Sequence, residues 1–366
     1  MGESRPLYMM IQDYILDQIR KGNWKPDDQI PPERELAEQF QVSRITAKAA
    51  IVGLVNKGYL SRQRGKGTFV AHVPGPGKSL ERMPVHSAAE GSKKLVGLII
   101  PWVEFRYFSL LLSGVEEELS KAGYHLIVKR ITGLETESQT IEAFLGIPVD
   151  ALIIVTSPGE HFNEDIIRLV LDKYPVILVE KSMQDIRTNS VYCDAGKGGA
   201  MMAEYLMGKG VRKIGLVTYP PRFTFGVKAR IFGFQSALVA GGVPPLSDDL
   251  ILSVTPDLLQ RSDDPEIPEE IIRFLSEHPE LEAVATVDAM LAKLVGKACY
   301  QMGRTDMRII CFDEPSYSKN AVYPTAYIDQ SPVEVGRIAV RLAMEALEGQ
   351  QEPKKCVIEP RLVELS

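Results

Sequence analysis

Cysteine is scarce in this sequence, with four among 366 residues, and no two of them stand at C-x-x-C spacing. A disulfide framework and a zinc site are therefore not expected, and a reducing cytosol is the natural compartment. Long apolar runs are also missing: the longest, 95–103 and 151–155, fall far short of the roughly 20 residues that a membrane-spanning helix needs. Residues 1–14 lack the basic segment and apolar block of a secretory signal. We expect a cytoplasmic protein that makes no contact with a membrane.

The motifs of common nucleotide-binding enzymes are absent as well. The first apolar run ends without a glycine-rich phosphate loop, and Gly196-Lys197-Gly198-Gly199 lacks the length of a P-loop. None of the five histidines stands at metal-ligand spacing from another or suggests a catalytic triad. We therefore expect no catalytic residue, no metal, no cofactor and no enzymatic activity. An enzyme fused to a binding module stays open as an alternative.

Acidic and basic residues are distributed unevenly along the chain. The net charge is −6, but residues 1–78 hold 12 basic against 8 acidic residues, a balance of +4 that leaves −10 for the remainder. Residues 42–66 contain six basic residues and no acidic one. This asymmetry is typical of a nucleic-acid-binding module joined to an acidic body.

Residues 72–94 divide the chain, because this stretch is rich in proline, glycine and serine and is typical of a linker. After it, apolar runs of strand length alternate with helix-length segments such as 108–122, 198–209 and 228–240. The strand candidates are Leu95–Pro101, His125–Arg130, Ala151–Thr156, Val176–Glu180, Lys213–Thr218, Ala283–Val287 and Arg308–Asp313. This alternation predicts an α/β fold with parallel sheets covered on both faces, and the roughly 270 residues suffice for two sheets.

Residues 1–71 carry the pattern of a small helical module. Apolar spacing predicts a first helix that ends at Gly22, a second helix over 33–40, and a third from an N-cap at Ser43 to about Asn56. One face of the third helix is apolar and can be buried. The other face presents three polar residues near its N-terminal end, namely Arg44, Thr46 and Lys48. That end of a recognition helix meets base edges and phosphates.

A short hairpin follows the third helix. Alternating segments at 59–63 and 68–71 predict two strands around the tip Arg64-Gly65-Lys66-Gly67. The tip is basic and small enough to approach a groove closely. A small helical domain with a solvated basic face is the alternative. The placement of charge, helix face and hairpin on one side favours a DNA reader.

Four segments of this module resemble the GntR-type winged helix: Ile30 to Ala37, Val42 to Arg44, Lys57 to Leu60 and Gly65 to Val70. The resemblance implies a winged helix-turn-helix (α+β) that binds double-stranded DNA. Position by position it assigns the DNA contacts to Arg34, Ser43, Arg44, Thr46, Lys48, Arg64 and Gly65, with Lys66 beside them at the basic tip. Lys48 stands where family members often carry arginine, which favours phosphate contact over base reading.

Residues 95–366 resemble the LacI-type sensor, which is related to periplasmic sugar-binding proteins. The segments that carry this resemblance are Gly97 to Pro101 with Tyr107-Phe108 and Gly114 to Glu116, Asp194 to Leu206 with Gly210 to Gly215, Ala229 to Phe234, and Ile310 to Glu314. The resemblance implies two Rossmann-like subdomains, one of about 95–193 with 330–349 and one of about 194–329 with 350–366. Three crossovers between them are expected near Tyr192–Asp194, Thr325–Gln330 and Gly349–Lys354, with helix Pro332–Leu347 returning to the first subdomain.

The same resemblance implies an effector site between the subdomains. Its residues are Tyr107, Phe108, Glu180, Asp194, Arg230, Asp288, Asp313 and Gln330. Carboxylates and a guanidinium suit a polyhydroxylated ligand, and aromatic rings suit its C–H faces. Alternative roles stay open: Tyr107 and Phe108 as core aromatics, the aspartates 194 and 288 as helix N-caps, and Arg230 with Asp313 as a structural ion pair.

Several positions depart from the family pattern. Ala195 and Val287 replace asparagines that members often carry, and Gly226 stands where a hydroxyl is common. The effector could therefore be a pentose, a deoxysugar or something less polar. We expect a homodimeric repressor that leaves a palindromic operator when a small sugar binds. A corepressor, a non-sugar metabolite and a solute-binding protein without a DNA role are the alternatives.

Overall fold

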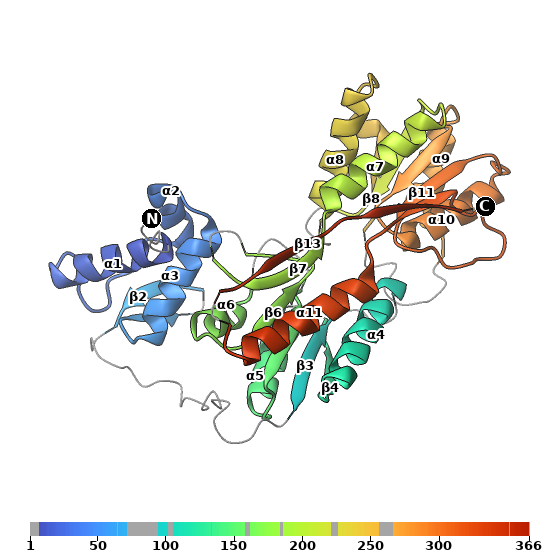
Figure 1. Ribbon diagram of the computed structural model, residues 1–366. Coiled ribbons are helices and arrows are strands. Elements are labelled where there is room, and N and C mark those ends of the chain that lie inside the picture. Colours follow the sequence, from blue (N-terminus) through green and yellow to red (C-terminus); the bar gives the residue numbers. More distant parts are fainter. Residues whose placement is uncertain are drawn as a thin grey trace.

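The computed structural model divides into a winged helix and two α/β subdomains (Figure 1). It describes residues 7–63, 65–71, 94–101, 105–132, 134–157, 162–183, 186–220, 226–255, 266–350 and 352–365. Arg64 and nearly all of the predicted linker lie outside the described residues. No helix in the described part of the chain has the length and apolar character to cross a bilayer.

Residues 7–71 fold as a winged helix, which we call the reader. Its elements are α1 (Leu7–Arg20), α2 (Glu33–Phe40), α3 (Arg44–Asn56), β1 (Leu60–Gln63) and β2 (Gly67–Val70). The two strands pair antiparallel. Ile11, Ile15, Leu36 and Leu54 are fully buried and join the three helices in one core. The predicted helices and hairpin are confirmed.

The first subdomain is a parallel sheet of strand order β13-β7-β6-β5-β3-β4. Its strands are β3 (Leu95–Ile100), β4 (His125–Arg130), β5 (Ala151–Val155), β6 (Val176–Val179), β7 (Asn189–Cys193) and β13 (Lys355–Ile358). All five residues of β5 are buried, because helices cover both faces of the sheet. One face packs on α4 (Arg106–Lys121) and α11 (Pro332–Leu347), the other on α5 (Leu134–Leu145) and α6 (Glu164–Leu171).

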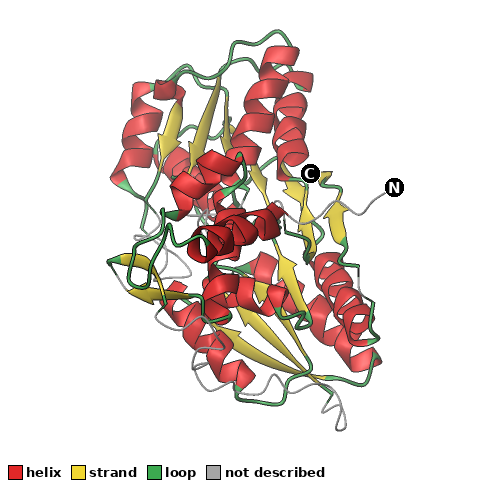
Figure 2. Cartoon of the chain, turned by 90° about the vertical axis from the view of Figure 1, so that its left-hand side faces the viewer, coloured by secondary structure: helices red, strands yellow, loops and turns green. Residues whose placement is uncertain are grey.

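The second subdomain has the strand order β14-β12-β11-β10-β8-β9. Its elements are α7 (Ala195–Gly208), β8 (Ile214–Thr218), α8 (Val227–Ala240), η1 (Asp248–Leu250), β9 (Ile251–Ser253), α9 (Glu269–Glu277), β10 (Ala283–Thr286), α10 (Ala289–Gln301), β11 (Arg308–Phe312), β12 (Ala326–Asp329) and β14 (Arg361–Glu364). Only β14 among these strands runs antiparallel to its neighbour. Helices lie on both sides of the strands in each subdomain (Figure 2). All seven predicted strands are present.

The chain crosses between the subdomains three times. It passes from β7 to α7 and from β12 to α11 at the two places that the sequence predicts. The third crossing lies between β13 and β14, later than the predicted 349–354. Residues 355–358 pair with β7 in the first sheet, so the assignment of 350–366 wholly to the second subdomain is wrong. The short β13 alternates exposed and half-buried residues, a pattern that does not identify its sheet.

Two glycines bring α4 and α11 into close contact. A Cβ added at Gly114 would lie 2.1 Å from the carbonyl oxygen of Val333, and one at Gly336 would lie 2.4 Å from the carbonyl oxygen of Leu111. Any side chain at these positions would push the two helix backbones apart.

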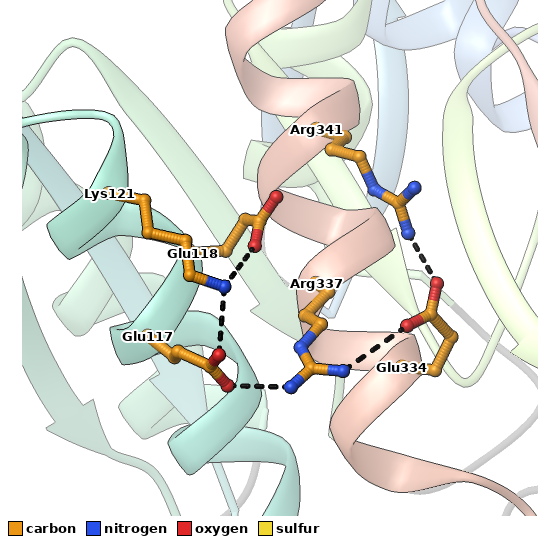
Figure 3. Close-up of polar contacts among 6 residues, drawn as sticks. All are labelled: Glu117, Glu118, Lys121, Glu334, Arg337 and Arg341. Carbon is orange, nitrogen blue, oxygen red and sulfur yellow. Dashed lines mark hydrogen bonds and ion pairs between the residues drawn. The ribbon is translucent and has the colours of Figure 1, made fainter.

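Exposed ion pairs flank this crossing (Figure 3). Glu117 of α4 accepts hydrogen bonds from Lys121 at 2.8 Å and from Arg337 of α11 at 2.7 Å. Those bonds, first to Lys121 and then to Arg337, lower the pKa of Glu117 to about 2. Because the pairs are open to solvent, packing at the glycines rather than charge holds the helices together.

Replacing Gly114 with alanine is expected to lower the free energy of unfolding by about 1–3 kcal/mol, because the added methyl group meets a backbone carbonyl that cannot rotate away. Gly208→Ala is the matched control, since a Cβ there meets nothing within 4 Å. Alanine favours a helix, so this control should be neutral or slightly stabilising. Urea unfolding followed by circular dichroism measures both. Equal transition midpoints for the two variants would contradict the close crossing.

Candidate DNA-reading face and effector cleft

The reader presents an exposed basic face. Arg34 on α2 has a side chain 73% exposed, and Arg44 at the first turn of α3 is exposed too. Both line a hollow of about 620 Å³ together with Arg62 and Gly65 of the wing. Lys66 is also exposed, at the tip of the hairpin. Guanidinium groups around a hollow suit phosphate and base contacts.

Ser43 and Thr46 cap α3. The backbone N–H of Thr46 donates to Ser43 Oγ at 3.3 Å, and the two hydroxyl oxygens lie 2.8 Å apart. Thr46 is fully buried, so the prediction that its side chain lies on the open face is wrong in this conformation. The predicted N-cap at Ser43 is confirmed, and serine is among the residues preferred at that position.

Lys48 and Arg62 contact the first subdomain, Lys48 as a half-buried residue and Arg62 while still exposed. Lys48 Nζ donates to the carbonyl oxygen of Phe162 at 2.9 Å and lies 3.9 Å from Glu164 Oε1. Arg62 forms ion pairs with Glu33 at 2.6 Å and with Glu164. Burial lowers the pKa of Lys48. One of the predicted DNA-reading residues, Lys48, therefore contacts the start of α6, and α3 lies beside α6 in Figure 1.

A cleft of about 450 Å³ between the subdomains is lined by Tyr107 and Asp313, two of the predicted effector residues. Arg230 of α8 lies outside that lining and is linked to Asp313 through Gln330. Its side chain is 9% exposed, and it donates to the carbonyl oxygen of Val287 at 2.6 Å and to Gln330 Oε1 at 3.0 Å. Gln330 Nε2 donates in turn to Asp313 Oδ1 at 2.7 Å. Gln330 thus links the guanidinium of Arg230 to the carboxylate of Asp313. These three predicted effector residues form one hydrogen-bond network.

Glu180 and Asp313 share an uncommon backbone geometry. They follow the buried strands β6 and β11 with φ angles of 67° and 66°. Residues other than glycine seldom adopt this left-handed conformation, and it is enriched at binding and catalytic sites. The two carboxylates also lie close enough to interact, since Glu180 raises the pKa of Asp313.

The three acidic side chains of this site are half-buried, and loss of hydration raises the pKa of each. Burial raises the pKa of Asp313 to about 7, while Arg230 and Gln330 oppose that shift. Burial also raises the pKa of Glu180, against the opposing effect of a hydrogen bond from the hydroxyl of Tyr107. Tyr107 and Glu180 come from the first subdomain, and both interact electrostatically with groups of the second. The cleft therefore holds polar groups from both sides.

Asp194 and Asp288 are helix N-caps in this structure. Asp194 accepts from the backbone N–H of Lys197 at 2.9 Å, and Asp288 accepts from that of Leu291 at 2.8 Å. The alternative of a capping role is thus confirmed for both, and a ligand contact at either stays a prediction. Phe108 is half-buried and packs edge-to-face on Tyr107, with ring centroids 5.1 Å apart.

Sequence reasoning missed two features of the cleft. The ring of Phe312 lies 4.0 Å from the guanidinium of Arg230 and supports it from the core. Arg106 of α4 pairs with Glu314 of the second subdomain at 2.6 Å and joins the two sides at the lip. An apolar strand residue such as Phe312 is indistinguishable from ordinary core in a sequence, and pairs this distant in the chain carry no local signal.

Carboxylates, an amide and a guanidinium suit a ligand with many hydroxyl groups. Glu180, Asp288 and Asp313 face a single guanidinium, so the cleft is acidic and unfavourable for an anionic ligand. Among the described residues no cluster of histidine, cysteine or acidic side chains could hold a metal ion.

Residues 93–329 match the family described as periplasmic binding proteins and sugar binding domain of the LacI family. The chain belongs to this family. Residues 7–70 match the family described as bacterial regulatory proteins of the gntR family. A LacI-type sensor is thus joined to a gntR-type reader, and the protein is a transcription regulator.

One relative matches this chain over nearly the full length of both proteins and is a repressor. Over 362 residues the chain is 25% identical to the arabinose metabolism transcriptional repressor of Geobacillus stearothermophilus, covering 96% of this chain and 94% of that protein. A solved complex of the transcriptional regulator CelR with cellobiose matches at a TM-score of 0.66, with 17% identity over 88% of this chain and 90% of that one. A LacI family regulator from Enterococcus faecium with bound ribose matches at 0.59, with 22% identity over 74% and 97%. Both structures support the fold.

Proposed function

We propose that the protein is a cytoplasmic homodimeric repressor that binds a palindromic operator and leaves it when a small uncharged sugar fills the cleft. One observation carries the proposal. Tyr107 and Glu180 of the first subdomain face the Arg230–Gln330–Asp313 network of the second. A ligand bound by both sides holds the cleft closed.

The chemistry of the cleft supports a neutral sugar. Each carboxylate accepts hydrogen bonds from hydroxyl groups, and Arg230 is the buried donor. Phosphorylated or acidic sugars are disfavoured, since Glu180, Asp288 and Asp313 outnumber the single guanidinium of Arg230 and repel an anion wherever they are ionised. Ala195 and Val287 offer no side-chain hydrogen bond, which favours a pentose or deoxysugar. The arabinose metabolism repressor that resembles this chain supports the same choice.

Release of the operator follows from a shift between two states. A sugar changes DNA affinity only to the extent that it binds the closed and open forms differently, typically by about 1–3 kcal/mol. Two copies related by a twofold axis would place two readers on paired half-sites. The opposite sign, an effector that strengthens operator binding, is the alternative that the test below separates.

A thermal-shift and calorimetry screen tests the proposal. Neutral pentoses and deoxysugars are expected to raise the melting temperature and to bind with one site per chain, because a ligand of the folded state stabilises it. The corresponding sugar phosphates and uronic acids serve as controls and should leave the melting temperature unchanged. A preference for the acidic compounds would overturn the assignment. Adding the active sugar to a protein–duplex complex then gives the sign of the response.

Effector binding is expected to weaken as the pH falls below 7. At pH 6 the carboxyl of Asp313 is mostly protonated, since burial raises its pKa to about 7. Hydroxyl donors on the ligand favour the ionised form, so affinity should fall by up to about tenfold per pH unit below that value. Glu180 and Asp288 raise the pKa of Asp313 further, and the positive charge of Arg230 opposes that shift. Calorimetry between pH 5.5 and 8.5 in buffers of different ionisation enthalpy measures the proton released.

Asp313→Asn provides the control for this pH dependence. Its amide stays neutral, so the affinity of the variant should be weaker and flat over the same pH range.

The unliganded protein adds a second check. Because the folded pKa lies above the usual value of 3.8, the stability due to the protonated Asp313 is present at low pH and is lost as the pH rises through about 7. The variant should therefore gain stability relative to the natural protein at pH 8 and not at pH 4. Parallel pH profiles for the two proteins would contradict the assignment.

A further inference from the structure

We propose that the start of α6 is a docking surface for the recognition helix α3, and that Glu164 occupies there the place of a DNA phosphate. The docking surface consists of Phe162, Glu164 and the apolar face of α6. The inference rests on the DNA-reading role of α3, and its experiment separates failure of the docking from failure of that role.

The polar contacts of Glu164 are those that a phosphate would make. Its carboxylate lies between Lys48 of α3 and Arg62 of the wing. It lines the basic hollow of the reader together with Arg34 and Arg44, and it is the single residue of the sensor in that lining. Paired basic side chains around an oxyanion are the contacts by which such readers hold the DNA backbone.

Apolar contacts extend the docking surface along α6. Ala49 and Val52 of α3 are 0% and 6% exposed, and both belong to the hydrophobic core of the first subdomain with Phe162 and Ile166. Neighbouring residues of the same helix, such as Ala50, pack into the core of the reader. The recognition helix is therefore apolar on two sides, one facing its own domain and one facing the sensor.

Docking and groove binding exclude each other. The side of α3 that holds Lys48 and Ala49 faces α6 here, and a duplex around the same helix would occupy that space. Operator binding thus requires the contact with Glu164 to open, and the population of the docked form reduces the apparent affinity for DNA. An effector that favours the docked form would release the operator.

Glu164→Gln tests this competition, with Glu277→Gln on α9 as the matched control for the lost charge. The probe is a fluorescent duplex selected by the natural protein from a random-sequence library. Loss of the carboxylate is expected to tighten binding by about three- to tenfold, because less of the protein is held docked. Glu277 is exposed and lies in the second subdomain, so its variant should bind as the natural protein does. Equal affinities for the two variants would overturn the docking proposal.

Hydrogen exchange on the unmodified protein gives an independent readout. Saturation with the selected duplex is expected to speed exchange in 162–171, since α3 no longer covers that segment, and to leave α10 unchanged. Unchanged or slower exchange in 162–171, with the duplex bound, would refute the docking and leave the DNA-reading role intact. If no duplex is selected or bound at all, the DNA-reading role itself fails.

Discussion

Arg230→Ala is expected to abolish the response to effector while leaving operator binding intact. The guanidinium is buried, donates to Gln330 and Val287, and rests on Phe312. Removing it leaves the polar groups around it unpaired in a buried site, which costs roughly 2–5 kcal/mol and weakens ligand binding at least about 30-fold. Calorimetry with the active sugar measures the loss, and anisotropy on the operator duplex measures the DNA affinity.

Arg230→Lys separates charge from geometry in the same site. Lysine keeps the positive charge but cannot donate to Val287 and Gln330 in the same fork, so its affinity should fall between the natural protein and the alanine variant. A normal effector response in Arg230→Ala would refute the assignment of the cleft. Loss of DNA binding in either variant would indicate a misfolded sensor and not a defect in the site, and a melting curve would show it.

Arg44→Ala is expected to have the largest effect on DNA. Arg44 lies exposed at the N-terminal end of α3 and lines the basic hollow of the reader. A bidentate contact of arginine with guanine contributes about 1–3 kcal/mol of discrimination, so affinity for the selected duplex should fall by roughly 5- to 150-fold. Affinity for a random duplex should fall much less, because non-specific binding loses only one positive charge that attracts the phosphate backbone.

Arg273→Ala on α9 is the matched control for Arg44→Ala. It removes the same charge from an exposed helix of the second subdomain. Its affinity for both duplexes should equal that of the natural protein. If both arginine variants lose selectivity equally, or neither does, α3 is not the recognition helix.

The amino-acid sequence predicts most of the architecture. Strands such as β5 are apolar throughout because both faces of their sheet are covered, and the start of α3 is marked by Ser43. The strands that were not predicted are β7, β9, β12, β13 and β14, which are short or mix polar with apolar residues. Such strands become stable only through pairing in the sheet, and pairing is a long-range property.

The candidate site was only partly predictable. The resemblance to the LacI-type sensor implied Glu180, Asp313, Arg230 and Gln330 as site residues, but it did not give the bridge that Gln330 makes to Arg230, about a hundred positions away in the chain. The contact of α3 with α6 was also hidden, because Ala49 and Val52 in a helix indicate burial without indicating the partner. The role of Thr46 was hidden for a similar reason. A polar residue at the start of a helix can either take part in the helix cap or contact DNA, and the sequence does not distinguish the two.

Anisotropy titration of the selected duplex, at low ionic strength and with each sugar of the neutral panel, tests the central claim most directly. We expect tight binding that weakens with added salt, and a further loss of affinity with at least one neutral sugar. A protein that binds no duplex under any of these conditions, or whose DNA affinity responds to none of its ligands, would contradict it.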